Sequence, residues 1–343
     1  MKSRIVFSLL VCLAVTFGCI DPIRLKTEEG AGALVIDGLI TDQPGPYTVR
    51  LSRTIAFDNS RPLRVYTVPE RGASIDISDN TGFSETLVES EAGVYKTSTI
   101  KGMVGSTYSI NVKTKDGKIF RSAGETMQPV AKVDSIRYEY AIYDRFFINS
   151  NGQPRTVKAE GFNIYAVTND PKGLGNYYRW QADGIFEFRS LIDNPELNTC
   201  WVYVDRLEAH LELSDDVLND GKSFVHRVCV VPYDRPSRYM VKMRQSSLTE
   251  RAYKYWKAAE SQQVATGSIF DPPPATLVGN VSSDDDTVPA LGYFGASSVK
   301  AFNVLFDRFK AAGYSVPSPN PPLLAGDCRI QWPGATNVRP DGF

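Results

Sequence analysis

Residues 34–52 read LVIDGLITDQPGPYTVRLS and contain two runs in which apolar and polar side chains alternate. Successive side chains of a β-strand point to opposite faces, so Tyr47, Val49 and Leu51 can share one buried face. The Gln-Pro-Gly-Pro segment at residues 43–46 separates the two runs and favours a turn. The stretch therefore predicts two short strands that each bury one face.

The same pattern continues along the next part of the chain. Further runs of this kind are ASIDIS, ETLVES, GVYKTST, TYSINVKT and KIFRSAG. Glycine-containing turn sequences lie between them, including Asn80-Thr81-Gly82 and Asp116-Gly117, where positive φ is tolerated. Seven strands in about 90 residues predict an N-terminal β-sandwich over residues 34–128, of immunoglobulin-like or transthyretin-like type.

The remainder, residues 129–343, is expected to form a larger β-rich domain, with MQPVAKVDSI (127–136) as the seam. Its strand-like runs are rich in aromatic residues, as in NYYRWQADGIFEFRS and CWVYVDR. Aromatic side chains suit the core between two sheets. The alternative interpretation is an exposed aromatic platform for a sugar or another flat ligand.

One amphipathic helix is predicted at residues 247–263, SLTERAYKYWKAAESQQ. Ser247 and Glu250 form the S-x-x-E pattern of a capping box. Apolar side chains at helical spacing are Leu248, Ala252, Trp256 and Ala259. The pattern indicates a helix that lies on a sheet.

A proline-rich segment follows this helix. Pro272, Pro273 and Pro274 each hold φ near −65°, so they predict a rigid bracket that returns the chain to a strand. Polyproline-like segments also dock in aromatic grooves. On that second interpretation Phe270, Pro272, Pro273, Pro274 and Trp256 are the candidate contacts for a ligand or a partner.

The N-terminus reads MKSRIVFSLLVCLAVTFGC, with two basic residues before an apolar run that is too short to span a bilayer. Gly18 directly before Cys19 is typical of a bacterial lipoprotein signal peptide. Cleavage would remove residues 1–18 and leave Cys19 as the first residue, with lipid such as palmitate on its thiol and amino group. Residues 19–33 would then be a tether. An ordinary secretory signal that contains a cysteine is the alternative.

Net charge and cysteine positions restrict the kinds of ligand and of site that the sequence predicts. The formal net charge is −1 at pH 7, which argues against nucleic-acid binding. Cys229 lies in the apolar run VHRVCVVPY and is expected to be buried, which leaves Cys200 and Cys328 as the preferred disulfide. The chain has no CxxC pair and only two histidines, so no zinc site is expected.

No familiar catalytic motif is present in the sequence, neither GxSxG nor HExxH. His210 and His226 lie in strand-like stretches and are interpreted as structural. The acidic run at 284–286 offers oxygen ligands for Ca²⁺, but adjacent acids on a loop point apart. Asp215 and Asp216 are expected at a solvated hairpin tip. The sequence therefore predicts no enzyme, no metal and no cofactor.

The order of several motifs resembles one known family. SSLTERAYKYW, GSIFDPPPATLVGN and LGYFGASSV, together with LVIDGLITDQPGPYTVRLSRT and NYYRWQADG, are similar to a family of Bacteroidota outer-membrane lipoproteins, number 4249 among the domains of unknown function. The resemblance covers almost the whole mature chain. It implies lipidation, placement at the outer membrane in the periplasmic or the cell-surface leaflet, and a non-enzymatic accessory role beside a TonB-dependent β-barrel receptor in nutrient uptake. The alternatives are a structural or assembly factor of the cell surface that binds no small molecule, and a hydrolase without a familiar motif.

Overall fold

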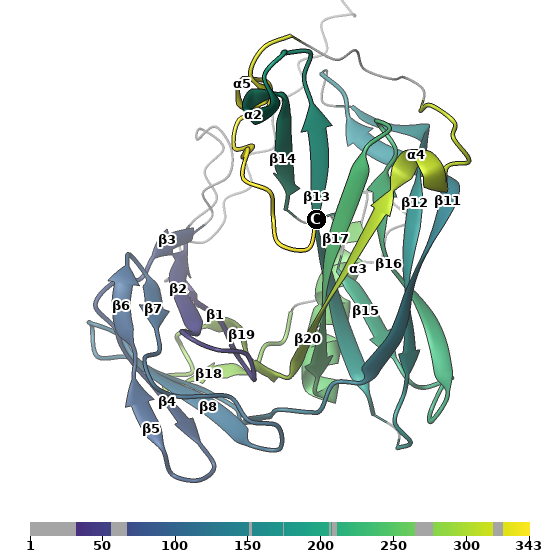
Figure 1. Cartoon of the computed structure of the whole chain (residues 1–343). Coiled ribbons are helices and arrows are strands. Elements are labelled where there is room, and N and C mark those ends of the chain that lie inside the picture. Colours follow the sequence, from purple (N-terminus) through teal and green to yellow (C-terminus); the bar gives the residue numbers. More distant parts are fainter. Residues whose placement is uncertain are drawn as a thin grey trace, which may run out of the picture.

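The computed structural model shows a mainly β protein built from two β-sandwiches that stand side by side (Figure 1). The residues it describes are 32–55, 67–150, 153–173, 175–205, 207, 211–264, 277–317 and 325–343. The mainly β class predicted from the sequence, with a sandwich at the N-terminal end, is confirmed.

The first sandwich consists of two six-stranded sheets. One has the order β19-β1-β2-β7-β6 with β3 beside β2, and the other has the order β18-β9-β8-β4-β5 with β10 beside β8. The strands of the first sheet are β1 (Leu34–Thr41), β2 (Thr48–Thr54), β3 (Thr67–Pro69), β6 (Val88–Glu91), β7 (Val94–Lys96) and β19 (Ala290–Ser297). Those of the second are β4 (Ser74–Asp79), β5 (Ser84–Thr86), β8 (Thr107–Lys113), β9 (Ile119–Ser122), β10 (Glu125–Thr126) and β18 (Val281–Ser283). Tyr47, Val49 and Leu51 are buried between the sheets, as their alternation predicts.

A late segment of the chain completes this sandwich. Strand β19 runs parallel to β1, from the pair Leu34–Ala290 to the pair Thr41–Ser297, and β18 pairs with β9. The expectation that residues 129–343 form one contiguous second unit is therefore wrong for residues 281–297. The open edge of β1 would otherwise present unpaired N–H and C=O groups, and a parallel partner has to come from a distant part of the chain.

The second sandwich packs a three-stranded sheet on a five-stranded one. The first has the order β11-β12-β16, and the second has the order β14-β13-β17-β20 with β15 beside β13. Their strands are β11 (Lys132–Ile148), β12 (Pro154–Asn169), β16 (Ser223–Pro232), β13 (Tyr177–Arg189), β14 (Thr199–Val204), β15 (Glu212–Asp215), β17 (Arg238–Leu248) and β20 (Val299–Asp307). Tyr178, Trp180, Phe186 and Phe188 are buried in the core between them. These four aromatic side chains therefore belong to the core, as the sequence predicts, whereas the side chain of Tyr203 is 50% exposed.

The C-terminal segment covers part of the five-stranded sheet. A disulfide joins Cys200 on β14 to Cys328 at the start of helix α5 (Cys328–Gln331), the pairing that the sequence favours. Cys229 is buried and lies outside the bridge. Phe343 packs on Trp201 at a ring distance of 6.1 Å. Two other short helices are α2 (Pro195–Asn198) and α4 (Arg308–Ala311).

Helix α3 (Glu250–Val264) follows β17 directly. The predicted capping box is wrong, because Ser247 still pairs in the sheet and its hydroxyl donates to the Gln128 carbonyl at 2.6 Å. Thr249 caps the helix instead, since its Oγ1 accepts from the Ala252 N–H at 3.1 Å. Sheet pairing through Leu248 therefore delays the helix start.

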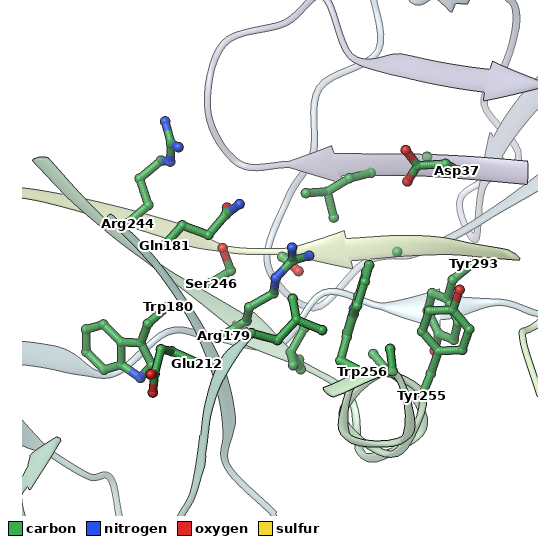
Figure 2. Close-up of a pocket in the computed structure, with 18 of the residues that line it drawn as sticks. Asp37, Arg179, Trp180, Gln181, Glu212, Arg244, Ser246, Tyr255, Trp256 and Tyr293 are labelled. Atoms are coloured by element: carbon green, nitrogen blue, oxygen red, sulfur yellow. The ribbon is translucent and has the colours of Figure 1, made fainter. Parts of the chain in front are cut away.

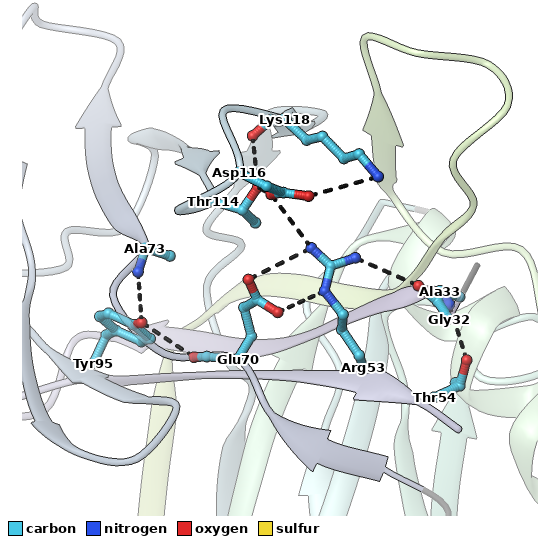
Figure 3. Close-up of polar contacts among 10 residues, drawn as sticks. All are labelled: Gly32, Ala33, Arg53, Thr54, Glu70, Ala73, Tyr95, Thr114, Asp116 and Lys118. Carbon is cyan, nitrogen blue, oxygen red and sulfur yellow. Dashed lines mark hydrogen bonds and ion pairs between the residues drawn. The ribbon is translucent and has the colours of Figure 1, made fainter. Parts of the chain in front are cut away.

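The described chain begins at an ion-paired edge of the first sandwich (Figure 3). Arg53 on β2 contacts Glu70 at 2.6 Å and Asp116 at 3.8 Å, and it donates to the Gly32 carbonyl at 3.4 Å. These contacts fix the place where the expected tether joins the folded protein. Cys19 itself lies outside the described residues.

Candidate functional site

A cleft of about 820 Å³ lies between the two sandwiches. Strands β1 and β19 of the first sandwich form one wall, and β13, β15, β17 and helix α3 form the other (Figure 2). The cleft is therefore a product of the way the chain returns to β1 after completing most of the second sandwich.

Strand alternation explains why charged side chains of the second wall face the cleft. On β13, Trp180 and Ala182 enter the core, so Arg179, Gln181 and Asp183 face the cleft. The neighbouring strand β17 adds Arg244, which forms an ion pair with Asp183 at 2.8 Å. The wall thus presents both charges on a rigid sheet.

Helix α3 contributes an aromatic surface to the cleft. The Arg179 guanidinium carbon lies 4.1 Å from the centre of the Trp256 ring, a cation–π contact (Figure 2). The predicted contact residue Trp256 therefore does line a cavity. The other predicted contacts, Phe270, Pro272, Pro273 and Pro274, lie outside the described residues.

A second aromatic pair lies beside an acid of the first wall. The rings of Tyr255 on α3 and Tyr293 on β19 are 4.8 Å apart, and Asp37 on β1 is exposed in the same cleft. Burial, followed by the negative charge of Asp37, raises the pKa of the Tyr255 hydroxyl. Tyr255 therefore remains a neutral hydrogen-bonding group at physiological pH.

Glu125 fixes the two walls to each other. Its carboxylate, 1% exposed, accepts from Arg251 Nε at 2.8 Å, from the Thr249 hydroxyl at 2.6 Å and from the Tyr293 hydroxyl at 2.6 Å. Burial and this carboxylate raise the pKa of Tyr293. Since Thr249 and Arg251 begin α3 while Tyr293 lies on β19, one buried acid joins the helix to the first sandwich.

His226 is outside the lining of the cleft but contacts two residues that belong to it. It stacks on Trp180 at 5.5 Å in the second sandwich, and its Nε2 is 3.7 Å from Glu212 Oε2. Burial, followed by the positive charge of Arg227, lowers the pKa of His226 to about 4. These contacts suit the structural role predicted for it. His210 lies outside the described residues.

The two acidic runs of the sequence differ in how far the structure buries them. Asp284 is exposed and paired with Arg121, and Asp285 accepts from the Thr287 hydroxyl at 2.6 Å in a solvated turn. Asp216, in contrast, is 1% exposed, so the prediction of a solvated hairpin tip is wrong for this residue. Burial of this acid follows from contacts with a loop far away in the sequence, which local pattern does not show.

Several cleft residues were not singled out from the sequence, among them Asp37, Arg179 and Asp183. The alternation of charged and aromatic residues in NYYRWQADG was the available signal for two of them. Because such alternation also describes any half-buried strand, it does not indicate that the polar face borders a cavity.

The fold is mainly β, and a cavity of about 820 Å³ lies between its two sandwiches. The chain belongs to the family described as Domain of unknown function (DUF4249), whose model matches residues 20–302. This match confirms the family that the motifs indicated. None of the curated proteins matches the chain. Among the helices in the described part of the chain, none has the length and apolar character needed to cross a membrane.

Proposed function

We propose that the protein is a lipid-anchored, non-enzymatic binding protein of the outer membrane that serves a TonB-dependent receptor in nutrient uptake. The observation that carries this proposal is the cleft of about 820 Å³ between the sandwiches. Its volume falls within the roughly 300–1,000 Å³ typical of ligand sites, which combine apolar surface with a few fixed polar groups.

The lining favours a ligand with both apolar and charged groups. Trp256 supplies a flat apolar surface, and Arg179 and Arg244 offer positive charge. Asp37 offers negative charge from the opposite wall. Because both walls are sheets held by the Glu125 contacts, the site is preformed, and binding would not have to order it.

The anchor would act by confinement. A fully extended chain from Cys19 to Gly32 reaches at most about 45 Å, so the lipid would hold both sandwiches close to the membrane surface. Confinement raises the effective concentration of the cleft at an integral receptor without any new contact. The residues that carry this step are Cys19 for lipid attachment and Arg53 for fixing the end of the tether.

Purification of the tagged, lipidated protein from its own outer membranes in mild detergent tests the proposal. A stoichiometric TonB-dependent β-barrel is expected among the co-purified proteins, and Cys19→Ser is expected to appear in the soluble fraction with unchanged unfolding. Recovery of the protein alone would contradict the partnership. Recovery with envelope-assembly proteins would favour a structural or assembly role instead, and retention of Cys19→Ser in the membrane would contradict the anchor.

A further inference from the structure

Three carboxylates meet at one end of the second sandwich, outside the lining of the cleft. Asp170 follows the last residue of β12, while Asp216 and Asp220 lie in the loop between β15 and β16. One carboxylate oxygen from each residue lies within 4.8 Å of the others. Two loops that are far apart in the sequence thus converge on one point.

Two of these carboxylates are buried without an ion-pair partner among the described residues. Asp170 is 5% exposed and Asp216 is 1% exposed. None of the ion pairs in the described part of the chain includes Asp170, Asp216 or Asp220. Buried charges in proteins are normally paired or coordinate a metal, since an unpaired buried charge is strongly destabilising. Like charges this close repel one another as well.

Neutral donors satisfy only part of the cluster. Asp170 Oδ1 accepts from the Tyr178 hydroxyl at 3.0 Å, whereas its Oδ2 is buried and has no hydrogen-bond partner. Asp216 accepts from the Asn176 side chain at 3.1 Å and from the Gly175 N–H at 3.3 Å. Asp220 Oδ1 accepts from the Gly173 N–H at 2.6 Å. These bonds orient the carboxylates and leave their negative charge uncompensated.

We propose that Asp170, Asp216 and Asp220 bind one Ca²⁺ ion. The donor set consists of carboxylate oxygens alone, without histidine or cysteine, which suits a hard cation. Ca²⁺ takes six to eight oxygens in irregular geometry, so it accepts mono- or bidentate carboxylates on two loops. Mg²⁺ requires near-octahedral ligands and keeps several waters, which two buried carboxylates leave little room to hold.

The ion would also support a wall of the cleft. Asp215, next to Asp216, accepts from the Tyr253 hydroxyl of α3 at 2.7 Å, and Tyr177 stacks on Tyr253 at 4.7 Å. Fixing the two loops therefore fixes the surface on which α3 packs. This site is separate from the lipid anchor and from any receptor, so the experiment below is independent of the proposed function.

Calorimetric titration of the metal-free protein with CaCl2 tests the assignment, in parallel with MgCl2. Ca²⁺ sites of extracellular protein modules have Kd values of roughly 0.1–1 mM, and we expect an affinity in this range. At a hundredfold excess of Ca²⁺ over Kd, Tm is expected to rise by about 5 °C. Tb³⁺ offers a second readout, because Tyr178 contacts Asp170 and should sensitise its luminescence until Ca²⁺ displaces it.

Asp220→Asn is the informative variant, because Asp220 is less buried than the other two acids and the fold should survive its change. It is expected to weaken Ca²⁺ binding at least tenfold and to abolish the rise in Tm. Asp286→Asn, in the exposed acidic turn, is the matched control and should bind as the wild type does. Absence of Ca²⁺ binding in the wild type, equal binding by Asp220→Asn, or tighter binding of Mg²⁺ than of Ca²⁺ would overturn the proposal.

Discussion

The guanidinium carbon of Arg179 lies 4.1 Å from the centre of the Trp256 ring, so a strand of the second sandwich and helix α3 meet inside the cleft. Such a pair holds an apolar surface and a positive charge side by side in a fixed orientation. In protein–protein interfaces a few residues, most often Trp, Tyr or Arg, contribute most of the binding energy. Trp256 is the aromatic residue of this cleft that is best placed for that role.

Trp256→Ala is expected to weaken retention of the co-purified receptor by tenfold or more. An aromatic contact of this type contributes more than about 1.4 kcal/mol to the free energy of binding. Tm should change little, since Trp256 is only partly buried. Quantitative co-purification from detergent-solubilised membranes measures the effect. Phe83→Ala provides the control, because Phe83 is an exposed aromatic in the first sandwich, outside the cleft lining. Equal retention of the two variants would exclude Trp256 from the binding site.

Glu125→Gln should lower the free energy of unfolding by about 2 kcal/mol, since hydrogen bonds to a buried charged group are each worth roughly 1.5–3 kcal/mol. Arg251 is half exposed and can turn toward water, which limits the loss. Denaturant titration measures the change. Glu91→Gln, at an exposed position, should stay within about 0.5 kcal/mol of the wild type. Similar effects of the two substitutions would mean that Glu125 does not hold the walls together.

Removal of the disulfide by the double substitution Cys200→Ser and Cys328→Ser should lower the free energy of unfolding by about 4 kcal/mol. The two cysteines are 128 residues apart, and a long closed loop restricts the unfolded chain strongly. A reducing agent should lower the Tm of the wild type and leave that of the double variant unchanged. A response of the double variant to reduction would show that the bridge is not the source of the effect.

His226 should make the protein less stable as pH falls from about 6.5 to about 4. The unfolded chain takes up a proton near pH 6.5, whereas burial delays protonation in the folded protein to about 4, so the unfolded state binds more protons in this window. The group accounts for a loss of about 2 kcal/mol between pH 7 and pH 5. Denaturant titrations at both pH values should show this loss in the wild type and a correspondingly smaller loss in His226→Phe. A loss of the same size in His226→Phe would assign the pH dependence to other groups.

Local patterns determined much of the fold. Alternation at Tyr47, Val49 and Leu51 was enough to place a strand and its buried face, because side-chain direction in a strand repeats every two residues. The apolar setting of Cys229 singled out Cys200 and Cys328 as the disulfide pair. The start of α3 was placed wrongly, because the strand pairing of Ser247 overrides a local capping signal.

By itself, then, the sequence determined the mainly β class, several strands of the first sandwich, the cysteine pair and the family. Only the tertiary structure decided that β19 returns to β1, that the return leaves a cleft lined by Arg179, Trp256 and Asp37, and that Asp170 meets Asp216. The physical reason is the separation along the sequence over which each kind of interaction acts. Periodicity and turn propensity act between neighbours, whereas strand partners, cavities and converging loops depend on contacts between residues that are far apart in the sequence.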